Sequence, residues 1–311
     1  MIPDGRTPVM VVTGFLGSGK TTLVNRLLKK QSASLVIVNE FGDVPVDHHL
    51  LEATEERAVA LPNGCLCCRL RGDLEETLVG AAMRRRRGEI AGFDRVIVET
   101  SGIADPGPVA QTLFADQALA RDFKLGPIVT VVDAADSGNR ESAWEVARAQ
   151  IAAADVVVLS KVDRPSARPE QARREIESLN PSAACVEASF GALDPALLQK
   201  SGTDHVFAEA AAHPTGVHGF TLKFDNPVPK DLLERFLGLL VELRGADLLR
   251  VKGVVALEGG ERILVQGVRH VFDRLRPVAL RETGLVFVTI QVSKSEVEEL
   301  WKAMSKLKGR R

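Results

Sequence analysis

The stretch VMVVTGFLGSGKTTLVNRLLKK, residues 9–30, runs from an apolar β-branched segment through a glycine-rich turn into an amphipathic segment. Its centre matches the pattern G-x-x-x-x-G-K-[ST] from Gly14 to Thr21. Gly14, Gly17 and Gly19 let the backbone curl so that its N–H groups point inward around a phosphate, an approach that side chains would block. A strand, this loop and a helix in that order predict a phosphate-binding P-loop.

The side chains of this loop fit the same chemistry. Lys20 brings a positive charge to the β and γ phosphates of a nucleotide, and Thr21 offers a hydroxyl ligand to Mg²⁺. The helix that begins here directs the positive end of its dipole at the anion. We therefore expect the phosphates to be held by Gly14, Gly17, Ser18, Gly19, Lys20, Thr21 and Thr22.

The remainder of the N-terminal half alternates between apolar β-branched runs and amphipathic runs with helical spacing. This alternation is typical of an α/β domain, here a P-loop NTPase domain with a mainly parallel sheet. The expected strands are 9–13, 35–39, 95–99, 128–133 and 155–160, and the expected helices are 20–30, 71–87, 141–153 and 168–179.

The character of the sequence changes near residue 200, which predicts a second domain. We expect a P-loop domain over 1–200, a linker over 201–216 with weak periodicity, and a smaller C-terminal α+β domain over 217–311. The elements expected in the smaller domain are strands at 217–225, 248–257, 261–268 and 285–292, with helices at 230–243 and 294–307.

The ends of two further strands carry polar residues where a doubly wound sheet places its ligand contacts. The segment VIVETSG ends a strand at Glu99, whose carboxylate is placed to hold Mg²⁺ or to orient an attacking water, and Gly102 follows with a backbone N–H for the γ-phosphate. The segment LSKVD contains Ser160, Lys161 and Asp163, a variant of the N-K-x-D guanine reader. The carboxylate of Asp163 accepts two hydrogen bonds from the edge of guanine, which favours GTP over ATP.

Composition excludes some classes of partner. The 311 residues are 45% hydrophobic and 26% charged, with a formal net charge of −1, so no bulk charge attracts nucleic acid or an anionic membrane. The sequence shows no signal segment and no apolar run long enough to span a bilayer. We expect a cytoplasmic protein.

Three of the four cysteines, Cys65, Cys67 and Cys68, lie within the segment LPNGCLCCRL. A cytoplasmic setting keeps thiols reduced, so clustered cysteines there point to metal binding or redox chemistry. Thiolates at this spacing are able to converge on one ion, for which Zn²⁺ is the default and Cu(I) a rival. Since three ligands leave a position open, we expect water, a ligand of the target, or the carboxylate of Glu40 or Asp43 to fill it.

These motifs together resemble the CobW-type GTPases, which are similar to the nickel-delivery GTPases of urease and hydrogenase maturation. The segments TGFLGSGKTTL, VNEFGDV, NGCLCC, VIVETSGIADPGPV and LSKVD occur in the order of that family, and LLRVKGVV and VQGVRHVF resemble its C-terminal domain. The resemblance implies a metallochaperone that hydrolyses GTP to GDP and phosphate. It also implies a metal at the C-x-C-C motif, most often Zn²⁺, with cobalt, iron or nickel as alternatives. Ser160 stands where the family usually has Asn, and Asp43 where Glu is common.

Other functions remain open at this point. A nucleotide-regulated adaptor or a thiol redox-sensing GTPase would carry the same P-loop without delivering metal, and a small-molecule kinase would transfer the γ-phosphate to an acceptor. The guanine reader disfavours the kinase. As partners we expect GTP and a client metalloprotein, and the sequence leaves both a monomer and a homodimer open.

Overall fold

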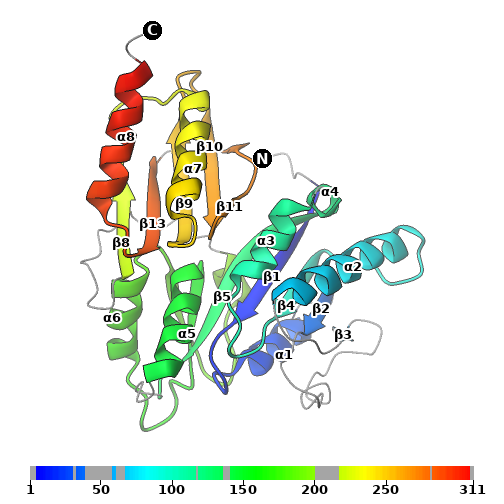
Figure 1. Ribbon diagram of the computed structural model, residues 1–311. Helices are drawn as coiled ribbons and strands as arrows, with labels where there is room; N and C mark the ends of the chain where they lie inside the picture. The colour runs from blue at the N-terminus through cyan, green and yellow to red at the C-terminus, as the bar shows by residue number, and fades with distance from the viewer. Residues whose placement is uncertain are drawn as a thin grey trace. The chain divides into compact units, whose positions relative to one another are not determined.

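The computed structural model describes most of the chain, and the described part divides into two compact units (Figure 1). One unit comprises the described residues within Ile2–Arg174 and Ala183–Gly202, and the other comprises Glu175–Ser182 together with those within Thr203–Arg311. The linker expected at 201–216 lies outside the described residues. The structure describes residues 5–30, 33–38, 58–60, 67–116, 118–135, 141–199, 217–280 and 282–308.

A seven-stranded sheet forms the centre of the first unit, with the strand order β3-β2-β4-β1-β5-β6-β7. Every neighbouring pair in this sheet is parallel. Strands of a parallel sheet are covered on both faces, which explains why β1, β4 and β6 are almost uniformly apolar and buried. The strands are β1 Thr7–Thr13, β2 Ser34–Val38, β3 Ala58–Ala60, β4 Arg95–Glu99, β5 Phe123–Asp133, β6 Val156–Ser160 and β7 Ala184–Ala188.

From β1 the chain moves to one side of the sheet for β2 and β3 and to the other side for β5, β6 and β7. Right-handed crossovers in these two directions place helices on both faces. Helix α1 packs Leu23, Val24 and Leu27 into one core cluster with strand residues such as Met10 and Ile97. Helices α2 and α3 contact each other and lie side by side (Figure 1). The helices up to residue 199 are α1 Lys20–Lys30, α2 Cys67–Arg86, α3 Gly107–Ala115, α4 Leu119–Asp122, α5 Glu141–Ala153, α6 Pro169–Leu179 and the 3₁₀ helix η2 Pro195–Gln199.

An antiparallel sheet of six strands forms the second unit, in the order β11-β10-β9-β13-β8 with β12 paired to β10. Two helices contribute to its core, in which Phe236 of α7 and Trp301 of α8 lie with Phe220 and Phe287 of the sheet. The elements are β8 Val217–Leu222, α7 Lys230–Arg244, β9 Leu248–Ala256, β10 Arg262–Val268, β11 Val271–Phe272, β12 Arg276–Pro277, β13 Gly284–Ile290 and α8 Lys294–Lys308.

The predicted fold class is confirmed in both units, a parallel α/β domain and an antiparallel α+β domain. Two boundaries are corrected and two strands are added. Helix α2 begins at Cys67 rather than at residue 71, and β5 begins at Phe123 rather than at 128. The sequence pattern does not predict β3 or β7. Within the described parts of the chain, every helix is too short or too polar to cross a membrane.

Candidate functional site

The loop between β1 and α1 has a backbone that only glycine adopts readily. Gly14, Gly17 and Gly19 have φ angles of 139°, 72° and 102°. At Gly14 a Cβ atom would lie 2.2 Å from the carbonyl oxygen of Val131, which is far inside van der Waals contact. The loop therefore passes directly over the backbone of β5, and a residue with a side chain at Gly14 would push it away.

Lys20 is buried at the start of α1, with 9% of its surface exposed. Its Nζ atom donates hydrogen bonds to the carbonyl oxygens of Gly14 at 2.9 Å and Phe15 at 3.2 Å. These contacts hold the ammonium group against the inside of the loop. A phosphate cradled by the loop would meet this charge at close range, where partial burial strengthens the attraction.

Thr21 and Glu99 are hydrogen-bonded across the carboxyl edge of the sheet. The Oγ1 atom of Thr21, the second residue of α1, donates to Oε1 of Glu99, the last residue of β4, at 2.7 Å. Glu99 is buried, with 4% of its surface exposed. A hydroxyl and a carboxylate are hard oxygen ligands of the kind that Mg²⁺ prefers, so this pair fits the cation that accompanies a nucleotide.

Two buried hydroxyl groups near this pair in the sequence have no hydrogen-bond partner among the described residues. They are Oγ of Ser18, in the loop, and Oγ of Ser101, two residues after Glu99. An unsatisfied buried polar group is costly, so its presence in a folded chain needs an explanation. Phosphate oxygens or the water shell of Mg²⁺ would satisfy both groups. Ser101 is not among the site residues predicted from the sequence, although its place between Glu99 and Gly102 is a usable signal.

The segment after β4 packs against the P-loop. Thr100 donates from its N–H to the carbonyl oxygen of Val12 at 2.9 Å and from its hydroxyl to Oγ1 of Thr13 at 2.9 Å. A Cβ atom at Gly102 would lie 2.5 Å from Cδ2 and 2.7 Å from the backbone nitrogen of Leu16. Gly102 thus lies directly beside the loop, and its approach to the phosphates stays a prediction.

At the end of β6, Ser160 and Lys161 contact the same loop from another direction. The hydroxyl of Ser160 donates to the carbonyl oxygen of Ser18 at 2.6 Å, so this side chain fixes the loop rather than reaching outward. The Nζ atom of Lys161 donates to the carbonyl oxygen of Gly17 at 2.7 Å and pairs with Oδ2 of Asp133 at 2.5 Å. Lys161 has a φ angle of 55°, a rare conformation that often marks a functional position.

Asp163 has a hydrogen-bond partner that the sequence motif does not reveal. Its Oδ1 atom accepts a hydrogen bond from the hydroxyl of Ser189 at 3.1 Å. Ser189 follows the last residue of β7, the strand that neighbours β6. The carboxyl ends of two neighbouring parallel strands therefore bring their loops together, and the second loop lies beside the carboxylate expected to read guanine. The missing prediction of β7 explains why Ser189 was overlooked.

The turn that contains Ser189 is held against α1. Phe190 has a φ angle of 50°, which is unusual for a bulky residue, and its carbonyl oxygen accepts from Nε of Arg26 at 3.3 Å. A Cβ atom at Gly191 would lie 3.0 Å from the carbonyl oxygen of Thr22. The P-loop helix, the end of β6 and this turn thus form one connected structure around the nucleotide-binding edge.

Comparison with known proteins agrees with this geometry. Residues 8–187 match the family described as CobW/HypB/UreG, nucleotide-binding domain, and residues 217–305 match the C-terminal domain of the cobalamin synthesis protein CobW. The chain belongs to the CobW/HypB/UreG family. It is a P-loop GTPase of that family, with the CobW type of C-terminal domain.

Similar members of the family include proteins named as zinc chaperones. The zinc chaperone YjiA of Escherichia coli K12 is 30% identical over 316 residues, covering 96% of this chain and 98% of that protein. The zinc chaperone CobW of Pseudomonas aeruginosa PAO1 is 33% identical over 322 residues, covering 86% of this chain and 82% of that protein. The crystal structure of Zn(II)-bound YjiA GTPase from E. coli superposes with a TM-score of 0.68 at 24% identity, covering 96% of this chain and 99% of that one, which shows a shared fold.

The metal motif expected in this CobW-type chain is described only in part. Cys67 and Cys68 are the first two residues of α2, whereas Cys65, Glu40 and Asp43 lie outside the described residues. Where side chains are described, no three His, Cys, Asp or Glu residues group as metal ligands. Cys185, the one cysteine whose side chain is described, is a half-buried free thiol on β7.

Proposed function

We propose that this CobW-family GTPase is a metallochaperone that binds Zn²⁺ at Cys65, Cys67 and Cys68 and delivers it to a client metalloprotein. Glu40 and Asp43 are proposed as further ligands. Support comes from the zinc chaperones to which the chain is similar over nearly its whole length. The thiolate is the form of cysteine that binds metal.

Topology relates the cysteines to the nucleotide site. Strand β3 ends at Ala60, pairs in parallel with β2, and is followed along the chain by α2, which begins at Cys67. Strands β2, β4 and β1 are neighbours in the same parallel sheet, so the carboxyl ends of β3, β4 and β1 lie at one edge. Strand β3, which precedes the proposed metal motif along the chain, therefore ends at the edge that also carries Glu99 and the P-loop.

For the nucleotide half of the proposal, each residue has a role that its contacts support. Lys20 stabilises the charge of the transferring phosphoryl group, Gly102 donates from its backbone N–H, and Thr21 and Glu99 hold Mg²⁺ or its water shell. When bound, Mg²⁺ supplies positive charge that neutralises the β and γ phosphates. Glu99 is also placed to orient the attacking water, since it ends β4 beside the loop.

For the base, we propose that Asp163 accepts the hydrogen bonds of guanine and that the stem of Lys161 packs across the ring. Lys161 already has its ammonium group fixed by Asp133 and the carbonyl oxygen of Gly17, which leaves its alkyl stem to cover the base. The bond from Ser189 holds the carboxylate of Asp163 in one orientation. A site whose acceptors are placed for the N–H groups of guanine rejects adenine, because those acceptors would then be left unpaired.

The observation that carries the proposal is the bond between Thr21 and Glu99 at a P-loop, on the sheet edge where β3, the strand that precedes the cysteines in the chain, also ends. A zinc-binding measurement alone would be a weak test. A triple mutant of YjiA that replaces one glutamate and two cysteines with alanine was itself crystallised as a Zn(II)-bound protein. The experiment must therefore measure transfer as well as binding.

We would compare the protein with the double variant Cys67→Ser/Cys68→Ser, using Cys185→Ser as the matched control because it removes a thiol from the same unit. Zinc affinity is measured in a competing chelator, and zinc transfer to an apo acceptor peptide is followed with GTP and with GDP. The proposal expects GTP hydrolysis to persist in all three proteins, and nucleotide-dependent transfer to vanish only in the double variant. Equal transfer by the double variant and the parent would exclude the cysteine motif as the delivery site.

A further inference from the structure

A buried glutamine on α5 holds the segment that follows β4. Gln150 has 0% of its surface exposed and lies near the C-terminal end of α5. Its Nε2 atom donates hydrogen bonds to the carbonyl oxygens of Ala104 at 3.0 Å and Gly102 at 3.3 Å. A side-chain amide has two N–H groups, and both are used here on one short stretch of backbone. A single side chain therefore ties two carbonyl groups of the segment 102–104 to α5.

The helix that carries this glutamine is itself fixed to the parallel sheet. The hydroxyl of Thr130 on β5 donates to the backbone carbonyl oxygen of Gln150 at 2.8 Å. Thr130 is buried, with 1% of its surface exposed, and β5 lies beside β1, the strand that leads into the P-loop. The side chain of Gln150 thus extends from a backbone position that the centre of the sheet fixes.

The bonds from Gln150 hold the inner side of the segment, whereas its outer side is open. The side chain of Ile103, between the two bonded carbonyl groups, is 46% exposed. Within the part of the chain that the structure describes, no other side chain donates a hydrogen bond to the segment 102–104. The Oε1 atom of Gln150 is buried without a hydrogen-bond partner among the same residues. An apolar side chain of this size would avoid that cost but would leave two carbonyl groups unpaired.

We infer that Gln150 is a positioning residue for GTP hydrolysis, which fixes the segment 102–104 so that the backbone N–H of Gly102 stays directed at the γ-phosphate. This inference rests on the role proposed above for Gly102 and involves neither zinc nor the cysteines. On one side Gly102 packs against Leu16 of the P-loop, and on the other its carbonyl group is held by Gln150. Because GDP has no γ-phosphate, loss of this positioning affects GTP and its hydrolysis but not the binding of GDP.

The test compares the full-length parent protein with Gln150→Met, which keeps the size of the side chain and removes both donors. We expect kcat for GTP hydrolysis to fall about tenfold or more, because a small displacement of a positioning group is costly to catalysis. The affinity for a non-hydrolysable GTP analogue should fall at least about threefold, and the affinity for GDP should stay within about twofold of the parent. Gln150→Glu, whose carboxyl group has at most one O–H donor, should also lower kcat, and it takes the place of the Met variant if that variant fails to bind GDP.

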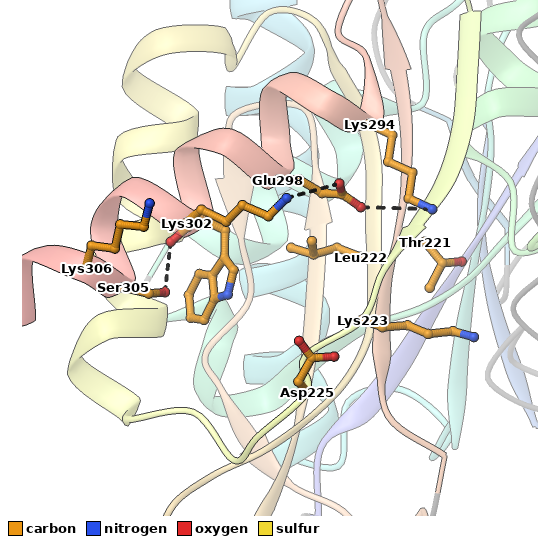
Figure 2. A pocket seen from close by; sticks show the side chains of 10 residues that line it. Thr221, Leu222, Lys223, Asp225, Lys294, Glu298, Lys302, Ser305 and Lys306 are labelled. Carbon is orange, nitrogen blue, oxygen red and sulfur yellow. Dashed lines mark hydrogen bonds and ion pairs between the residues drawn. The ribbon is translucent and has the colours of Figure 1, made fainter. Parts of the chain in front are cut away.

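Two control variants separate positioning from a general loss of stability. Thr130→Val removes a hydrogen bond to the backbone of Gln150 and leaves its side-chain amide in place. Thr221→Val removes a buried hydroxyl from the second unit, where Thr221 lines the pocket shown in Figure 2 and has no hydrogen-bond partner among the described residues. Both variants should keep kcat and both nucleotide affinities within about twofold of the parent.

An unchanged kcat in the Gln150 variants, equal losses of affinity for GDP and for the GTP analogue, or the same loss of kcat in Thr130→Val would each overturn the inference. Gly102→Ala, measured beside them, tests the role on which the inference rests. If Gly102→Ala weakens the GTP analogue and the Gln150 variants do not, Gly102 acts without Gln150 and the inference is wrong. If none of these variants weakens the analogue, the role proposed for Gly102 is wrong as well.

Discussion

The hydroxyl of Thr21 donates a 2.7 Å hydrogen bond to the carboxylate of Glu99 and so joins the first turn of the P-loop helix to the end of β4. Both partners are hard oxygen ligands, and both come from elements that the sheet fixes in place. This relationship gives the nucleotide site its most direct test.

Replacing Glu99 with Gln should lower kcat for GTP hydrolysis about 100-fold, because the amide neither holds the Mg²⁺ shell nor accepts a proton from water. The affinity for GTP should change much less, since Lys20 and the loop backbone remain. Phosphate release measured over a Mg²⁺ titration checks this. Recovery of full kcat at high Mg²⁺ would assign Glu99 to the cation, and an unchanged kcat at all Mg²⁺ concentrations would remove it from the mechanism.

Gly102→Ala should disturb the P-loop, because the new Cβ atom would lie 2.5 Å from a side-chain atom and 2.7 Å from the backbone nitrogen of Leu16. We expect GTP affinity to fall about tenfold or more, as one displaced loop atom is enough to misplace the phosphates. Gly80→Ala on α2 is the matched control, since a Cβ atom there meets nothing within 4 Å. Calorimetric titration with a GTP analogue should separate the two variants, and equal affinities would contradict the close approach of Gly102 to the loop.

Ser189→Ala should weaken GTP binding about threefold to tenfold, because removal of one neutral hydrogen bond leaves Asp163 less well oriented. Asp163→Asn should weaken GTP binding more, by at least about 100-fold, because the amide group of Asn would place N–H donors opposite the N–H donors of guanine. ATP should be affected by neither change. Fluorescent analogues of GTP and ATP measure these affinities. Equal losses for the two nucleotides would show that Asp163 and Ser189 shape the site without reading the base.

Glu296 and Ser293 close the first turn of α8 in the second unit. The backbone N–H of Ser293 donates to Glu296 at 2.8 Å, and its hydroxyl donates at 2.9 Å. The backbone bond is the main reason why the pKa of Glu296 lies below its usual value. A carboxyl with a lowered pKa in the folded state stabilises the fold above the unfolded value of about 4.3, and this contribution is lost as the pH falls through the folded value.

We therefore expect the protection of the backbone amides at the start of α8, measured relative to the intrinsic exchange rate at each pH, to fall below about pH 4 in the parent protein. Glu296→Gln should show the lower protection already at neutral pH, and Ser293→Ala should destabilise the helix by about 1 kcal/mol. Glu299→Gln, a matched change outside the cap, should behave as the parent. A parent whose protection at the start of α8 does not fall in acid would disprove the role of this cap.

Much of the fold follows from local sequence, but strand lengths do not. The sequence pattern places the start of one strand at residue 128, because Gly126 and Pro127 interrupt the apolar run. The structure continues β5 back to Phe123 and absorbs the interruption with a shift of register, in which Val9 pairs with Leu125 and Val11 pairs with Ile128. Proline and glycine are tolerated at such a bulge, which only the pairing with β1 makes visible.

The candidate site, like the fold, could be predicted only in part from local sequence. The P-loop and Glu99 were predictable because their chemistry is concentrated in short contiguous motifs that follow apolar strands. Ser189 was not, since β7 has the sequence ACVEA, whose small and half-buried residues give no strong pattern. Ser189 lies near Asp163 because β6 and β7 are neighbours in the sheet, which is a feature of the tertiary structure. The roles of Cys65, Glu40 and Asp43 stay predictions of the sequence.

Delivery of zinc under the control of GTP requires that the metal and the nucleotide be coupled. Zinc affinity measured in a competing chelator, for the apo protein and for its complexes with Mg²⁺–GDP and with a Mg²⁺–GTP analogue, tests it most directly. We predict affinities that differ between nucleotide states by roughly 5- to 150-fold, with zinc changing the affinity for the GTP analogue by the same factor. The Cys67→Ser/Cys68→Ser variant should lose this difference. The same zinc affinity in all three states of the parent protein would contradict the account.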